Sequence, residues 1–192
     1  MIAENYLKSM HRQFSYYKSL GEKAIAQIED DDKLFHQVNE DSNSIATIVK
    51  HLSGNMISRW TDFLTTDGEK EWRNRDGEFE NDIKTRAEVI ALWDKGWDRL
   101  FKTLDELKPG DLEKIIYIRN EGHTVMEAIN RQVAHYPYHV GQIVYIAKMV
   151  KDSAWESLSI PRNKSKEYNT GKFAQEKTQR HFTDEFLKKK KD

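Results

Sequence analysis

Two histidines four residues apart, His135 and His139, are the residues whose types and spacing most directly indicate chemistry in this chain. On a helix, side chains at positions i and i+4 lie above one another on the same face, so the two imidazoles can share one metal ion. Such a pair is weak evidence when taken alone. Pairs with this spacing are common by chance, and buried histidines also bond to backbone carbonyls.

A third histidine, His51, strengthens the metal interpretation. It lies on a different expected helix, on the same stripe as Ile48 and Leu52, and therefore near the buried side. Three neutral imidazoles that converge inside a bundle leave at least one coordination position open, which is typical of a reactive site. His123 is not expected to join them, because a continuous helix would place it about 18 Å from His135.

Three polar side chains are candidates for a catalytic role beside the ion: Asn55, Arg131 and Gln142. Each lies three or four residues from one of the three histidines, and helical spacing places it near the face of that histidine. A cationic Arg131 beside an open metal is suited to hold an anionic thiol cofactor or substrate. The alternative, that Arg131 is an ordinary surface residue, stays open at this point.

Four long helices are expected to position these residues, because apolar residues recur with the helical period over most of the chain. They cover about residues 4–28, 42–65, 85–107 and 125–150. Thr85 and Thr124 each begin the pattern T-x-x-E, which is the capping box of a helix start. The polar stretch 68–84 is too long for a tight turn between antiparallel neighbours, and therefore predicts a crossover along the bundle.

Residues 1–151 are expected to form the all-α bundle, and residues 152–192 a C-terminal extension that packs on it. Beyond Lys151 the helical pattern ends, although Phe173, Phe182 and Phe186 indicate a last short helix. We expect the tail to be partly disordered or to form that helix, and we interpret the run Lys188 to Lys191 as solvated. The segment Ile115 to Ile118 alternates weakly and could be a short extended piece.

The composition limits the classes of function. Lys and Arg number 31 against 32 Asp and Glu, so the net charge of −1 provides no global field for nucleic acid or an anionic membrane. There is no cysteine, which excludes disulfides, thiolate ligands and a cysteine nucleophile. The first residues lack the features of a signal peptide, and the longest clean apolar run, Ile143 to Ala147, is far shorter than a membrane span. We expect a cytoplasmic protein that binds neither nucleic acid nor membrane.

The motifs together resemble a known superfamily. His51 within Ile48-Val49-Lys50-His51-Leu52, followed far downstream by His-x-x-x-His-x-Gly-Gln over His135 to Gln142, is similar to the DinB-like superfamily. More narrowly, the chain resembles a bacterial family of unknown function within it. The stretch Leu158 to Arg162, with Ser165, Tyr168 and Asn169, is similar to the C-terminal end of that family, so the resemblance spans most of residues 1–169.

This resemblance implies an up-down-down-up four-helix bundle, with a crossover between its second and third helices, in which His51, His135 and His139 hold one divalent cation. In such relatives the ion is usually zinc or nickel. Characterised relatives include thiol transferases that use bacillithiol and isomerases that use mycothiol, whereas others have no assigned activity. A homodimer is suggested by the same resemblance.

Three functions follow as hypotheses. In the first, the chain is a metal-dependent enzyme that transfers a low-molecular-weight thiol, such as bacillithiol, to an electrophilic small molecule. The thiol must then arrive as a cosubstrate, because the chain has no cysteine. In the second, it is a non-catalytic metal-binding protein with a stress-related or ligand-binding role. In the third, it is a metal-dependent hydrolase, although no Asp or Glu lies within 135–142 to act as a base.

Overall fold

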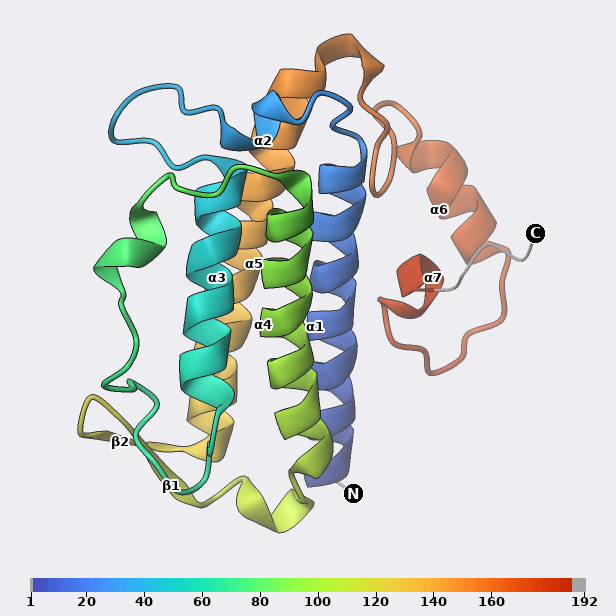
Figure 1. Cartoon of the computed structure of the whole chain (residues 1–192). Coiled ribbons are helices and arrows are strands. Elements are labelled where there is room, and N and C mark those ends of the chain that lie inside the picture. The colour runs from blue at the N-terminus through green and yellow to red at the C-terminus, as the bar shows by residue number, and fades with distance from the viewer. Residues whose placement is uncertain (1, 188–192) are drawn as a thin grey trace.

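The computed structural model describes residues 2–187, and most of them are helical (Figure 1). The four longest helices are α1 (Ile2–Ala26), α3 (Ile45–Trp60), α4 (Arg86–Glu106) and α5 (Val125–Lys151). The shorter ones are α2 (Asp32–Phe35), α6 (Ser165–Phe173) and α7 (Asp184–Leu187), with 3-10 turns η1 (Asp76–Phe79), η2 (Pro109–Asp111) and η3 (Asp152–Ala154). The prediction of a mostly helical protein is confirmed. The lysine run Lys188 to Lys191 lies outside the described residues.

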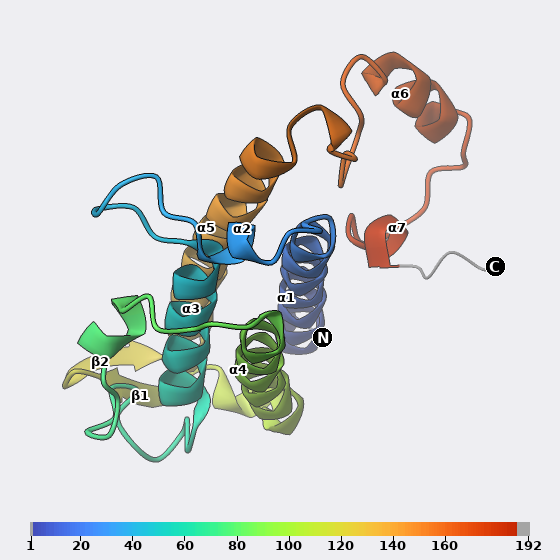
Figure 2. The same cartoon turned by 45° about the horizontal axis from the view of Figure 1, so that its top comes forward.

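The four long helices lie side by side, as the two views in Figures 1 and 2 agree. In the view of Figure 1, α1 and α5 run upward and α3 and α4 run downward. Helix α3 packs against α4 and α5, and α1 packs against α4 and α5. Because α3 and α4 run in the same direction, the chain between them returns along the outside of the molecule, and η1 lies on this return path.

The helix starts follow from local side-chain chemistry. Thr85 and Thr124 each accept a hydrogen bond from the backbone N–H three residues later, and Glu88 and Glu127 bond back, so both predicted capping boxes are present. At the start of α3 the cap is Ser44, which accepts from the backbone N–H of Thr47 at 3.1 Å. Helix α3 therefore begins at Ile45, three residues after the start near residue 42 that the sequence predicts.

A short β-hairpin departs from the expected all-α fold. Strand β1 (Ile115–Ile118) pairs antiparallel with β2 (Glu121–Thr124), and Arg119 and Asn120 form the turn with φ of 56° and 63°. The Asp67 carboxylate accepts both backbone N–H groups of this turn at 2.9 Å, which anchors the hairpin to the return segment. Sequence reasoning missed the second strand because Glu-Gly-His-Thr has no apolar alternation.

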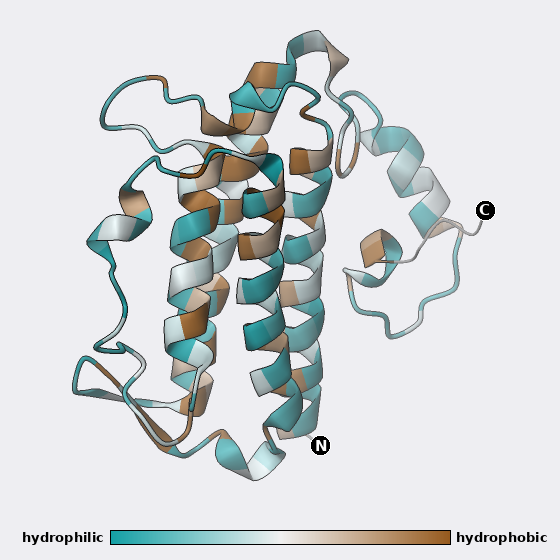
Figure 3. Cartoon of the chain, in the orientation of Figure 1, coloured by the Kyte–Doolittle hydropathy of each residue, from teal (hydrophilic) through white to brown (hydrophobic). Residues whose placement is uncertain are grey.

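Aromatic side chains form the centre of the core. Phe14, Trp60, Trp93, Trp97 and Tyr136 are all almost fully buried, and the Phe14 ring contacts three of the others. Hydrophilic residues dominate the outward sides of α1 and α4 (Figure 3). These three tryptophans are therefore core residues, and none of them lines the pocket beside the three histidines.

The last described residues return to α1 through α7. The rings of Phe182 and Phe186 lie 5.8 and 5.2 Å from the ring of Tyr16 on α1, and Thr183 is fully buried. Phe173, at the end of α6, is instead 86% exposed.

Among residues 2–187, no helix combines the length and the apolar character that crossing a membrane would require.

Gly96 determines how closely α3 and α4 approach, because a Cβ at this position would lie 2.9 Å from the Cα of Ser53. Gly96→Ala is therefore expected to lower the free energy of unfolding by about 1–3 kcal/mol, measured by denaturant titration followed by circular dichroism. At Gly141, on the exposed side of α5, an added Cβ meets nothing within 4 Å. Gly141→Ala should raise stability by roughly 0.5–1 kcal/mol. A loss of the same size at both positions would contradict the close-approach explanation.

Candidate metal centre

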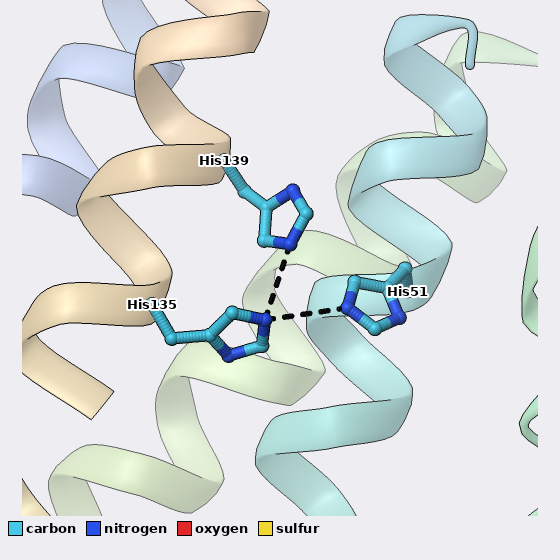
Figure 4. Close-up of side chains that lie close together, drawn as sticks. All are labelled: His51, His135 and His139. Atoms are coloured by element: carbon cyan, nitrogen blue, oxygen red, sulfur yellow. Dashed lines mark hydrogen bonds between the residues drawn. The ribbon is translucent and has the colours of Figure 1, made fainter. Parts of the chain in front are cut away.

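The structure brings the three predicted histidines together on facing sides of two helices (Figure 4). His51 comes from α3, and His135 and His139 come from α5. The Nε2 atom of His135 lies 3.5 Å from that of His51 and 3.1 Å from that of His139. One nitrogen from each ring lies within 4.8 Å of the others, so the group could hold a metal ion.

Each of the three rings is oriented through its other nitrogen, Nδ1. The Nδ1 of His51 lies 2.9 Å from Glu78 Oε2, that of His139 lies 2.8 Å from Gln142 Oε1, and that of His135 lies 3.4 Å from Gln132 Oε1. A carboxylate or amide oxygen accepts hydrogen bonds, so Nδ1 carries the proton in each ring. The lone pair then remains on Nε2, the atom that faces the centre of the group.

The donor set fits a divalent cation. Three Nε2 lone pairs directed toward one another repel at these separations, and a cation among them converts the repulsion into attraction. In a tetrahedral zinc site with Zn–N bonds of 2.0–2.1 Å, two nitrogens lie about 3.3 Å apart. The observed separations of 3.1 and 3.5 Å bracket this value. Imidazole nitrogen suits zinc, nickel, copper and iron alike.

Comparison with known proteins places the chain in a family. Residues 1–164 match the family described as protein of unknown function (DUF1572). The chain belongs to this family. No curated protein and no solved structure matches it significantly. The matched residues contain all three histidines and end just before α6, so α6 and α7 of this DUF1572 protein lie beyond the matched region.

Burial favours neutral ligands at the centre of this DUF1572 protein. It lowers the pKa of His135 to about 3, and the neighbouring rings of His139 and His51 add to the shift. Burial also lowers the pKa of His139, although the hydrogen bond to Gln142 opposes this. A histidine binds metal only in its neutral form, so these two residues are prepared for coordination at neutral pH.

Glu78 connects the centre to a buried ion pair. Its carboxylate receives two hydrogen bonds from Arg73, at 2.7 and 2.8 Å, in addition to the one from His51. Burial alone would raise the pKa of Glu78, but the bonds from Arg73 and His51 outweigh it and hold the pKa below its ordinary value. A Cβ at position 54 would collide with this carboxylate, so Gly54 on α3 leaves the space that Glu78 occupies.

Two of the three orienting residues were missed by sequence reasoning. Gln132 lies three residues before His135, and this same-face spacing, which was used for Gln142, would have found it. Glu78 had no local signal, because it lies 27 residues after His51 in a polar stretch without helical periodicity. Gln142, which sequence reasoning did find, contacts His139 but does not line the pocket.

The three histidines form one wall of a pocket of about 420 Å³. Its lining consists of His51, Asn55, Arg59, Arg73, Arg75, Phe79, Arg119, Arg131, Gln132, His135, Tyr138 and His139. The predicted residues Asn55 and Arg131 therefore both face the site. The Oδ1 atom of Asn55 already accepts from the Tyr136 hydroxyl at 3.0 Å. His123 stays outside the group of three, as expected, with its Nε2 3.5 Å from Arg131.

Proposed function

We propose that this DUF1572 protein is a DinB-like bundle of up-down-down-up topology, and that His51, His135 and His139 bind one divalent metal ion. The helix directions in Figure 1 support the topology. The observation that carries the metal proposal is the convergence of three Nε2 atoms, each with its Nδ1 held by a side-chain oxygen. Zinc and nickel are the ions we propose, because relatives in the superfamily that the chain resembles usually hold one of these two; imidazole nitrogen accepts both.

We further propose that the protein is a metal-dependent transferase that moves a small thiol onto an electrophilic small molecule. A divalent cation, when bound here, would lower the pKa of a coordinating thiol so that it is present as thiolate near neutral pH. The three histidines leave one side open, and that side faces the pocket. In the transfer, the sulfur would form a bond to the electrophilic carbon, the leaving group would depart with its electron pair, and the thiol proton would pass to solvent.

The protein itself would bind and orient the thiol. Arg131 lies on the pocket wall one turn before His135, where its guanidinium can hold an acidic group of the thiol compound. Glu78, Gln132 and Gln142 hold the histidine rings in place. Since the chain has no cysteine, the nucleophilic sulfur would be supplied by a cosubstrate such as bacillithiol.

A hydrolase is the less supported alternative, because hydrolysis usually benefits from a carboxylate base near the metal. No Asp or Glu lines the pocket in the described part of the chain. The nearby Glu78 is already bonded to Arg73 and His51, and Glu127 is engaged in the capping box of α5. A non-catalytic metal-binding protein is the other alternative, and it would use the same three histidines.

The test is to load the purified protein with zinc or nickel and to measure turnover of a chromogenic electrophile with a panel of low-molecular-weight thiols. We expect turnover to require both the metal and a thiol, and to be lost in His139→Ala. In cobalt-loaded protein, binding of the thiol should add a sulfur-to-metal charge-transfer absorption band. A metal-loaded protein that neither binds nor turns over any thiol of the panel would contradict the transferase proposal and support a non-catalytic role.

A further inference from the structure

The pocket above the three histidines is strongly positive. Its lining includes five arginines, Arg59, Arg73, Arg75, Arg119 and Arg131, and no acidic residue. Within the described residues, two carboxylates form ion pairs with these arginines, Glu69 and Glu78. Five positive charges against two negative ones leave a net charge of +3 before any metal is counted.

The five arginines divide into two groups. The side chains of Arg59 and Arg73 are only 6% and 2% exposed, and their carboxylate partners hold them in the wall of the pocket. Arg75 and Arg131 form no ion pair within residues 2–187, and both are exposed to solvent. Arg119 pairs with Glu69 at 3.0 Å, yet its side chain is 54% exposed and Glu69 is shared with Arg59 and Arg73. Three guanidinium groups therefore have N–H donors available at the pocket.

These three arginines come from three separate elements. The Arg75 guanidinium lies over the ring of Phe79 at 5.5 Å, and Phe79 in turn stacks on His51 at 4.8 Å. Arg119 lies in the hairpin turn that the Asp67 carboxylate anchors. Arg131 projects from α5, one turn before His135. Three separate elements thus place like charges around one space, and an anion bound there would lower their mutual repulsion.

We propose that Arg75, Arg119 and Arg131 form an oxyanion site, and that the natural ligand of the pocket carries at least two negative charges on carboxylate or phosphate groups. Planar guanidinium groups match such oxygens with paired hydrogen bonds. One end of the ligand would bind at the arginines while its reacting end reaches the three histidines. The location of the reacting end rests on the proposed function, but binding of the acidic end does not need the metal.

The proposal is tested by calorimetric titration of the full-length protein with citrate and with inorganic phosphate, at constant ionic strength. The titration is done both with and without the metal, and acetate serves as a singly charged comparison. We expect saturable binding of citrate or phosphate that is at least about tenfold tighter than that of acetate and persists without the metal. Preference for citrate would indicate a polycarboxylate ligand, and preference for phosphate a phosphorylated one.

Two variants locate the site. Arg75→Gln and Arg131→Gln should each weaken binding by about tenfold, because each removes a charged hydrogen-bond donor. Arg162→Gln removes the same charge from an exposed position outside the pocket lining and should change the affinity less than about twofold. Circular dichroism confirms that each variant is folded. Equal weakening by all three changes, or no saturable binding of either anion, would overturn the proposal.

The outcomes separate this proposal from the proposed transferase. Anion binding that survives in metal-free protein, together with an absence of thiol turnover, would sustain the oxyanion site and contradict the transferase. Thiol turnover without any anion binding by metal-free protein would support the transferase and contradict the oxyanion site.

Discussion

Replacing His135 with alanine should reduce the affinity of the protein for zinc or nickel by more than about 100-fold. His135 is the middle member of the group, since its Nε2 lies within 3.5 Å of the Nε2 atoms of both His51 and His139. Loss of a residue that only orients a ligand typically costs 10–100-fold in metal affinity, and loss of the ligand itself removes a coordination bond outright. Competition with a chromogenic chelator measures the affinity directly.

The matched control is His123→Ala. His123 is on β2 and contacts Arg131, but it does not belong to the group of three histidines. Its removal should leave metal affinity unchanged within about twofold, because no coordination bond is lost. If His135→Ala retained metal as well as the wild type does, the ion would not be bound at this centre, and the transferase proposal would lose its basis.

Replacing Glu78 with alanine should have the largest effect on stability among the polar residues of the site. The side chains of Arg73 and Glu78 are only 2% and 7% exposed, so the change leaves a buried guanidinium without this partner. Breaking a buried ion pair from one side typically costs 3–5 kcal/mol, and we expect about 3 kcal/mol, since Glu69 still contacts Arg73. Metal affinity should fall by about 10–100-fold as well, because the His51 ring loses the oxygen that orients it.

Two further variants test the charge of Glu78 and provide an exposed control. Glu78→Gln retains an oxygen for His51 but loses the charge that faces Arg73, so it should lose stability while it retains much of its metal affinity. Glu71→Ala, an exposed acidic residue on the same segment, should change neither property. If Glu78→Ala unfolded at the same denaturant concentration as Glu71→Ala, the buried ion pair would contribute nothing to the fold.

The effect of Glu78 on stability should also depend on pH. The folded-state pKa of this carboxyl is lowered relative to its value in the unfolded chain. Its contribution is therefore fully present above the unfolded pKa of about 4.3 and is lost as the pH falls through the folded pKa. The difference in unfolding free energy between wild type and Glu78→Gln should be constant near neutral pH and should decrease below about pH 4.

The sequence by itself determined the features that depend on short spacing. Residues four apart on a helix share a face, so His135 and His139 were predictable as a pair, and Gln142 as a neighbour of that pair. The capping boxes at Thr85 and Thr124 are also local, because they involve side chains and backbone groups within one turn. For the same reason the helical class of the protein could be predicted from periodicity alone.

Only the tertiary structure decided which distant residues complete the site. Glu78 reaches His51 because the segment between α3 and α4 returns along the outside of the long helices, and no local pattern marks the residue that will face the centre. Arg75 and Arg119 enter the pocket from that segment and from the hairpin, neither of which has helical periodicity. Spacing along a chain specifies which residues are neighbours within one helix or strand. Contacts between elements depend on the path of the irregular loops that join them, and the packing of the whole molecule decides that path.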